Sequence, residues 1–226
     1  MTLQFRDRAE AGRLLAEKLR RFRGREDAIV LALPRGGVPV GFEIAKALHV
    51  PLEVFVVRKL GVPGHEELAI GAIASGNTSY INEDIVKALR VSSGMLEGVI
   101  QREKQELTRR ESKFRDPHQQ LNLTNKTVIL VDDGLATGAT MHAAVNGVKT
   151  HEPAAVIVAV PVSARDTYNN FKFDVDDIIA VALPEEFASV GQWYRNFNQT
   201  TDEEVAELLE RARSTQEEFH EASSSH

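Results

Sequence analysis

Two adjacent carboxylates, Asp132 and Asp133, follow a short apolar run and precede a turn of small residues. The apolar run, residues 128–131, has β-branched residues at three of its four positions and lacks helical spacing, which is typical of a strand buried on both faces. The turn, residues 134–140, is rich in glycine and threonine, and a helical pattern covers residues 141–149. The sequence therefore predicts a strand, an acidic pair, a tight turn and a helix in direct succession.

A strand that ends in such a turn and enters a helix is an arrangement that binds phosphate. Small residues let backbone N–H groups approach the anion, threonine hydroxyls add donors, and the N-terminus of the helix adds positive potential. The carboxylates suit hydroxyl groups or a metal beside that phosphate, so a ligand such as ribose 5-phosphate satisfies both halves. A phosphate-binding turn of some other α/β protein is the alternative. A P-loop and a dinucleotide fingerprint are disfavoured, because neither G-x-x-x-x-G-K-[ST] nor G-x-G-x-x-G occurs.

An ordinary globular composition limits the function classes open to this chain. Its 226 residues are 42% hydrophobic and 27% charged, which suits one large domain with a hydrophobic core. The sequence has no run of about 18 apolar residues and its first residues are too polar for a signal peptide, so we expect a cytoplasmic protein without a membrane span. The absence of cysteine excludes disulfides and thiolate metal sites, and the net charge of −6 argues against general binding to nucleic acid.

Short apolar strands alternate with helical patterns along the chain, and this alternation predicts a parallel sheet with right-handed crossovers. We expect the strands at residues 28–33, 52–57, 128–131, 154–160 and 177–183, with a separate β-hairpin at 68–74 and 78–81. The main helices are expected at residues 7–22, between the turn at 34–39 and about residue 48, and at 82–89, 93–115, 141–149, 163–171 and 201–213.

Two further strand ends carry basic residues. The first strand is followed by Arg35, Gly36 and Gly37, a group in which backbone amides and a forked guanidinium can face an anion. Tight turns also use glycine and proline for purely conformational reasons, so this stretch is weak on its own. The next strand ends in Arg58 and Lys59, at the edge where ligands bind in open α/β sheets.

The hydrophobic run, the acidic pair and the Thr/Gly-rich turn together resemble the signature of the type I phosphoribosyltransferases, which bind 5-phosphoribosyl-1-pyrophosphate (PRPP). All three parts are present in order. The resemblance covers about residues 28–183. It implies an α/β fold of three layers with a doubly wound, mainly parallel β-sheet and a small hood built from the C-terminal and N-terminal parts of the chain. A long inserted helix would be an addition to that fold.

The resemblance also implies roles for individual residues. The acidic pair would hold the ribose hydroxyls, would hold Mg²⁺ indirectly through the ribose or water, and would act in catalysis with the basic pair. The implied positions are Asp132, Asp133, Arg58 and Lys59 for catalysis, Ala136, Thr137, Gly138, Ala139 and Thr140 for the 5-phosphate of PRPP, and Arg35, Gly36, Gly37, Arg58 and Lys59 for the pyrophosphate.

Two local features of the backbone belong to the same resemblance. A cis peptide bond is expected between Pro34 and Arg35. A loop at about residues 60–67 is expected to close over the site, with His65, Glu66 and Glu67 as its titratable groups and no catalytic role assigned to them. A solvated surface loop is the alternative for this segment.

The hood, residues 184–200, holds the only tryptophan of the chain. In the resembled family a hood selects the nitrogenous acceptor. We expect Phe187, Trp193 and Tyr194 to contact the acceptor, because aromatic faces stack well on flat rings. The alternative is that these side chains pack the hood onto the core.

We predict a single domain over residues 1–213 and a disordered tail over 214–226. Residues 82–115 form a helical insertion, whose thin apolar stripe would pack on the flank of the sheet or on another subunit. The insertion also carries a basic cluster of Arg109, Arg110, Lys113 and Arg115. Nucleic-acid binding is one interpretation of this cluster, but the interspersed glutamates favour a solvated face with i,i+4 ion pairs.

The implied reaction transfers the 5-phosphoribosyl group of PRPP to a nitrogenous base, with inversion at C1, release of pyrophosphate and dependence on Mg²⁺. The 6-oxopurine enzymes of the resembled family have aspartate where this chain has Ala136, and the pattern is closer to the adenine type, so the acceptor stays open. A regulatory protein that binds PRPP or a nucleotide, and an enzyme of hydrolysis or phosphorolysis, are the alternatives. The expected partners are small molecules, with no membrane and no nucleic acid, and a homodimer is an open alternative.

Overall fold

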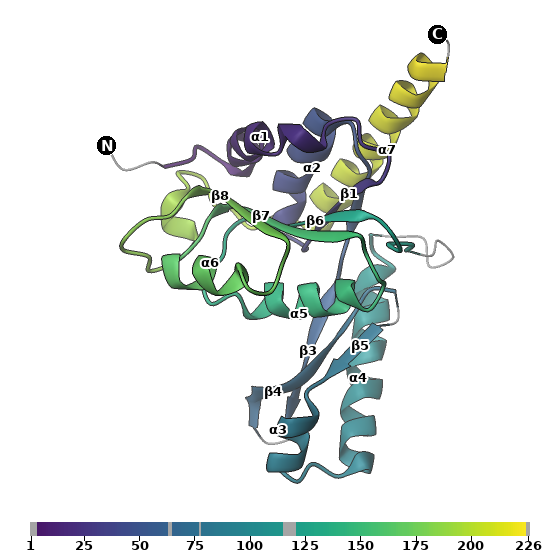
Figure 1. Cartoon of the computed structure of the whole chain (residues 1–226), viewed down its shortest axis with the longest axis vertical. Helices are drawn as coiled ribbons and strands as arrows, with labels where there is room; N and C mark the ends of the chain where they lie inside the picture. Colours follow the sequence, from purple (N-terminus) through teal and green to yellow (C-terminus); the bar gives the residue numbers. More distant parts are fainter. Residues whose placement is uncertain (1–3, 63–64, 77, 115–120, 225–226) are drawn as a thin grey trace.

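The computed structural model describes residues 4–62, 65–76, 78–114 and 121–224 (Figure 1). Within these residues the main sheet has five strands in the order β2-β1-β6-β7-β8, and each pairing between neighbours is parallel. The strands are β1 (Ala28–Ala32), β2 (Leu52–Val54), β6 (Thr127–Val131), β7 (Ala155–Val162) and β8 (Asp177–Ala182). This arrangement confirms the predicted α/β class and its mainly parallel sheet.

The two central strands are apolar on both faces because helices cover both. Every residue of β1 and β6 is buried. Val30 and Ile129 belong to one hydrophobic cluster, whereas the next residues along each strand, Leu31 and Leu130, belong to a second cluster. Successive side chains of a strand point to opposite faces, so each strand supplies both clusters.

Helices form the outer two layers. Helices α1 (Arg8–Lys18), α2 (Gly37–Leu48) and α7 (Asp202–Ser224) lie on one face of the main sheet, and α5 (Ala139–Lys149) and α6 (Arg165–Phe171) lie on the other (Figure 1). The first three helices contribute buried side chains to one hydrophobic cluster, and the other two contribute to the second. Among the helices that the structure describes, none pairs the length with the hydropathy that a bilayer span requires.

A second, antiparallel sheet extends away from the main sheet (Figure 1). Its strands are β3 (Val57–Val62), β4 (His65–Ala74) and β5 (Thr78–Ile81), in the order β3-β4-β5. The β4–β5 hairpin is as predicted. The strand predicted at 52–57 begins as expected at Leu52, but its predicted end was wrong, because β2 ends at Val54 and a new strand starts at Val57.

The segment predicted as a closing loop, residues 60–67, falls mainly in β3 and β4. Leu60 and Val62 of β3 are buried and Lys59 is exposed, so this segment has the period of two that suits a strand. The tip between the strands, residues 63–64, lies outside the described residues. The side chains of His65 and Glu66 also lie outside the described part of the chain.

The helical insertion contains α3 (Glu83–Ala88) and the long helix α4 (Ser93–Glu111), as predicted. Helix α4 packs on β3 and β4, with Val99 and Leu107 as its buried side chains. The apolar stripe of α4 therefore covers the second sheet. Arg115 of the predicted basic cluster lies outside the described residues.

The hood and the N-terminal segment lie side by side. Phe5 donates its N–H to the carbonyl of Trp193 at 2.8 Å, and its own carbonyl accepts the N–H of Arg195 at 2.8 Å. Two short 3-10 helices, η1 (Arg20–Phe22) and η2 (Gly191–Trp193), flank these parts of the chain.

The prediction of a disordered tail was wrong for residues 214–224, which are helical. Helix α7 continues from Asp202 as far as Ser224 instead of ending near Arg213. The added turns are rich in residues with good helix propensity, such as Gln216, Glu217 and Glu218. Phe219 also stacks on His49 of the capping turn of α2, with 4.4 Å between ring centroids, so a tertiary contact supports the extension.

Candidate active site

The turns after β1 and β6 meet at one edge of the main sheet because these strands are neighbours in register. Ala32 lies opposite Val131, and the N–H of Leu33 donates to the Val131 carbonyl at 2.9 Å. Residues 34–37 and 132–140 therefore leave the sheet together, at its carboxyl edge. Ligands of open α/β folds bind at this edge.

The glycine pair lets the first turn pack against the acidic pair. A Cβ atom on Gly36 would lie 2.1 Å from Oδ2 of Asp133, and a Cβ atom on Gly37 would lie 2.7 Å from the carbonyl oxygen of Val131. Neither position has room for a side chain. The structure thus brings together two motifs that are about a hundred residues apart in the sequence.

The peptide bond between Pro34 and Arg35 is cis, which confirms that prediction. The Arg35 side chain is partly exposed, and its Nη1 lies 3.6 Å from Oδ1 of Asp202, the first residue of α7. Arg35 therefore projects from the turn toward the start of α7.

The acidic pair is held by an arginine that sequence reasoning did not identify. Arg8 contacts Oδ2 of Asp133 through Nε at 2.9 Å and Nη2 at 2.8 Å, and the two side chains are only 12% and 15% exposed. Oδ1 of Asp132 accepts the N–H of Asp133 at 2.8 Å. The one sequence feature that could have indicated Arg8 is its position in the first turn of a helix, where the helix dipole disfavours a cation.

Burial determines the proton affinity of both carboxyls. It raises the pKa of Asp132 well above its usual value, and the neighbouring Asp133 carboxylate raises that pKa further. Burial also raises the pKa of Asp133, while the Arg8 guanidinium opposes this change. Arg8 thus favours the ionised form of the carboxylate that it contacts.

Arg8 also joins the acidic pair to the hood. Its Nη1 donates to the carbonyl of Asn198 at 2.7 Å, and its guanidinium carbon lies 4.0 Å from the centroid of the Phe197 ring. The hydroxyl of Tyr194 donates to the backbone carbonyl of Asp133 at 2.6 Å. The hood is therefore anchored on the acidic pair from two directions.

The small-residue turn is held by hydrogen bonds to the end of β7 and the residues after it, and most of its side chains are exposed. Leu135 donates its N–H to the Val162 carbonyl and accepts the N–H of Ala164, both at 2.9 Å, and Thr167 Oγ1 donates to the Ala136 carbonyl at 2.5 Å. Gly138, with φ of 76°, then leads into the N-terminus of α5. The side chains at four turn positions, Ala136, Thr137, Ala139 and Thr140, are exposed.

This geometry suits an anion. The first N–H groups of a helix have no intrahelical acceptor, and they carry the positive end of the helix dipole. In α5 these groups follow directly on an open turn with two threonine hydroxyls. Of the five residues predicted to bind the 5-phosphate, four are exposed at this turn and the fifth, Gly138, is buried.

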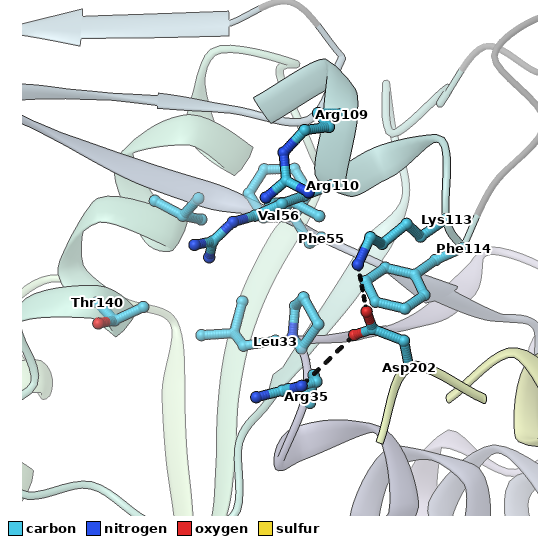
Figure 2. Close-up of a pocket in the computed structure, with 12 residues that line it drawn as sticks. Leu33, Arg35, Phe55, Val56, Arg109, Arg110, Lys113, Phe114, Thr140 and Asp202 are labelled. Carbon is cyan, nitrogen blue, oxygen red and sulfur yellow. Dashed lines mark hydrogen bonds and ion pairs between the residues drawn. The ribbon is translucent and has the colours of Figure 1, made fainter. Parts of the chain in front are cut away.

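A cavity of about 430 Å³ opens between the first turn, the junction of β2 and β3, the end of α4 and the start of α7 (Figure 2). Its walls combine apolar and charged side chains. The described residues that line it are Leu33, Pro34, Arg35, Phe55, Val56, Val57, Arg109, Arg110, Lys113, Phe114, Thr140 and Asp202.

Arg58 and Lys59 do not belong to the lining of this cavity, as far as the described residues show it. Arg58 pairs with Glu103 of α4, with Nη2 2.6 Å from Oε2, and Lys59 is exposed. Both residues are in β3, beyond the end of β2, so they do not sit at the carboxyl end of a main-sheet strand. Their roles in catalysis and in pyrophosphate binding remain predictions.

The hood aromatics are mostly core residues. Trp193 and Tyr194 are 7% and 4% exposed and form a small cluster with Phe5 and Val162. Phe187 is half-buried and stacks on Trp193 with 6.4 Å between centroids. Burial leaves Trp193 and Tyr194 without a free ring face for a ligand, which supports the packing alternative over the acceptor contact predicted for them.

The comparison with known families agrees with this geometry. The phosphoribosyl transferase domain matches residues 4–190, so the chain belongs to the phosphoribosyl transferase family. The match includes the acidic pair, both turns and the second sheet.

Two kinds of relatives are similar to this chain. It is 44% identical over 208 residues to a Mycobacterium tuberculosis (strain ATCC 25618 / H37Rv) protein named "Putative phosphoribosyl transferase Rv0571c", covering 92% of this chain and 47% of that protein. The chain thus spans about half the length of the curated relatives it matches. Among solved structures it is similar to TT1426 from Thermus thermophilus, with 40% identity, a TM-score of 0.80, and coverage of 91% of this chain and 97% of that one.

Proposed function

We propose that this chain transfers the 5-phosphoribosyl group of PRPP to a nitrogenous base and releases pyrophosphate in a Mg²⁺-dependent reaction. One observation carries the proposal: the turn with Gly36 packs directly on Asp133, next to the small-residue turn that leads into α5. The small-residue turn, the two carboxylates and a cavity lined by cations thus share one edge of the sheet. A ribose with phosphate groups at both ends matches these three parts.

The roles of the residues follow from their chemistry. The backbone of residues 136–140 would grip the 5-phosphate, far from the bond that breaks, and would position the ribose. Asp132 and Asp133 would accept hydrogen bonds from the ribose hydroxyls. Their negative charge would also stabilise an oxocarbenium-like transition state, which is positive at C1.

Magnesium fits the donor set at this edge. No group of three or more His, Cys, Asp or Glu side chains that could hold a metal occurs among the described residues. Mg²⁺ is commonly bound by one or two carboxylates together with substrate phosphates and water, which suits Asp132 and Asp133 beside a polyphosphate. A bound Mg²⁺ would supply charge neutralisation for the departing pyrophosphate.

A regulatory protein that binds PRPP or a nucleotide is the second candidate, and the ion pair between Arg8 and Asp133 favours it. A fixed cation on the carboxylate reduces the negative potential available to a developing positive charge. Such a protein would bind PRPP and leave it intact. The acceptor base is left open within the proposal, because Ala136 offers no carboxylate for a 6-oxopurine.

A paired substitution tests the proposal. Asp132→Asn together with Asp133→Asn should lower the rate of pyrophosphate release by at least about 10²-fold, because the lost interactions act in the transition state. Asp84→Asn, on the exposed surface of α3, is the matched control and should keep the wild-type rate. A double variant that turns over like the wild type would remove the assignment of the ribose site.

A further inference from the structure

Four cationic side chains from two distant parts of the chain converge on the cavity. Arg109 and Arg110 come from the last turn of α4, Lys113 follows that helix, and Arg35 comes from the turn after β1 (Figure 2). Against these four cations the lining has one carboxylate, Asp202, so its formal charge is 4 − 1 = +3. Cations gathered around a cleft repel one another, and a cleft of this kind attracts anionic ligands.

The α4 arginines are held so that most of their donors stay available. Glu106 accepts two N–H groups of Arg109 and one of Arg110, each at 2.8 Å. The pair of Glu106 with Arg110 confirms the i,i+4 pairing expected for this face, and its pair with Arg109 is i,i+3. A guanidinium has five N–H donors, so within the described chain each arginine retains donors for a ligand. The helix surface is therefore a preorganised cationic wall as well as a solvated face.

Asp202 bridges the two remaining cations. It forms an ion pair with Arg35 at 3.6 Å and hydrogen-bonds Lys113. Figure 2 shows its carboxylate between these two side chains. The carboxylate oxygens of Asp202 therefore pair with both cations, as the oxygens of a bound phosphate would.

The position and size of the cavity indicate its ligand. Thr140 of the phosphate-binding turn and Arg35 of the first turn both line it, so a ligand held at residues 136–140 can extend into it. Its volume of about 430 Å³ lies in the range of small-molecule sites. Phe55, Val56 and the neighbouring apolar wall lower the local dielectric, which strengthens charged contacts.

We propose that this cavity is the site for the diphosphate group of the ribose donor, and that Arg109, Arg110 and Lys113 of the insertion hold that group together with Arg35. The proposal rests on the proposed function and adds a new set of binding residues to it. Asp202 is the internal counter-ion of Arg35 and Lys113, and the diphosphate displaces it from them. The insertion is thereby part of the binding site.

Titration calorimetry with inorganic pyrophosphate and Mg²⁺ tests this assignment. Arg110→Gln with Lys113→Gln should weaken pyrophosphate binding at least about tenfold, since charge-assisted hydrogen bonds to an anion are lost. Arg102→Gln, an exposed position of the same helix outside the cavity, is the matched control and should bind like the wild type. Ribose 5-phosphate, bound through residues 136–140, should keep its affinity within about twofold in all these variants.

Asp202→Asn should change the affinity for pyrophosphate in the opposite direction. Without the competing carboxylate, pyrophosphate should bind several-fold more tightly, so a folding defect cannot imitate the result. Weaker or unchanged binding in this variant would overturn the role of Asp202 as a counter-ion.

The outcomes separate the two proposals. A wild-type protein that binds neither pyrophosphate nor ribose 5-phosphate would remove the proposed function and this inference with it. A wild-type protein that binds both, with a double variant of α4 that retains full pyrophosphate affinity, would overturn the inference alone.

Discussion

At the scale of single residues, the central feature is a pair of buried carboxyls with one arginine. Asp132 has a strongly raised pKa because burial disfavours its charge and because Asp133 is next to it. Arg8 offsets part of this effect at Asp133. Ionisation of both carboxyls is therefore unfavourable for the folded protein, and in the proposed reaction their negative charge would stabilise a cationic transition state.

Replacing Asp132 by Asn should stabilise the protein at neutral pH. The folded state holds the Asp132 proton more tightly than the unfolded state, whose pKa is near 3.8. The stability due to this proton is present below pH 3.8 and is lost as the pH rises through the folded pKa. Asparagine avoids this loss, and its Oδ1 still accepts the N–H of Asp133.

Calorimetric melting at pH 4 and pH 8 measures the effect. We expect a gain of about 1 kcal/mol at pH 8, or roughly 2–4 °C in Tm, and a smaller gain at pH 4. Asp84→Asn on exposed α3 should change neither value. An Asp132→Asn protein that melts below the wild type at pH 8 would show that the charge of Asp132 stabilises the fold.

Arg8→Ala should be strongly destabilising, because it leaves the Asp133 carboxylate buried without its cation. Removal of one partner of a buried ion pair typically lowers the free energy of unfolding by about 3 kcal/mol. Arg13→Ala is a control on the same helix, since its pair with Glu43 is half exposed and should contribute less than about 1 kcal/mol. Urea unfolding compares the two, and equal losses would refute the special role of Arg8.

At the scale of elements, the hood is attached to the core by buried aromatic rings and by the N-terminal segment. Trp193 and Tyr194 pack with Phe5, whose backbone pairs with the hood. Phe197 is the more exposed ring and stacks on Arg8. Core packing and contact with Arg8 are thus divided between neighbouring aromatic residues.

Trp193→Ala should lower the free energy of unfolding by about 3–5 kcal/mol, the range for removing a large aromatic side chain from a core. The remaining folded protein should lose affinity for PRPP and for the acceptor to a similar extent. Phe197→Ala is the exposed comparison and should give a clearly smaller stability loss. A selective loss of acceptor affinity in Trp193→Ala would restore the stacking role that the hood sequence suggested.

The elements also show why some predictions were right and others wrong. The strand, acidic pair and turn at 128–140 were predictable because the signal lies within thirteen consecutive residues. The end of the strand at 52–57 and the loop at 60–67 were misassigned, since the apolar run there continues across the junction between β2 and β3. The extension of α7 depends partly on the contact of Phe219 with His49, which no local pattern contains.

At the scale of the whole molecule, the parts of the site come from every region of the chain. The contact of Arg8 with Asp133 spans 125 positions, and Asp202 meets Arg35 from the far end of the sequence. Periodicity and motif spacing cannot reveal such contacts, because they depend on how α1 and α7 pack beside the sheet. The sequence therefore predicted the acidic pair and its turn better than the cationic cavity.

The most direct test of the account is an untargeted activity measurement. The protein is incubated with PRPP, Mg²⁺ and a pool of nucleobases and related metabolites, and consumption is followed by mass spectrometry. We expect one base to disappear while its ribonucleotide and pyrophosphate appear, and the variant with Asp132→Asn and Asp133→Asn to remain inactive. PRPP that binds and stays intact, with every base unchanged, would contradict the transferase and support a regulatory protein.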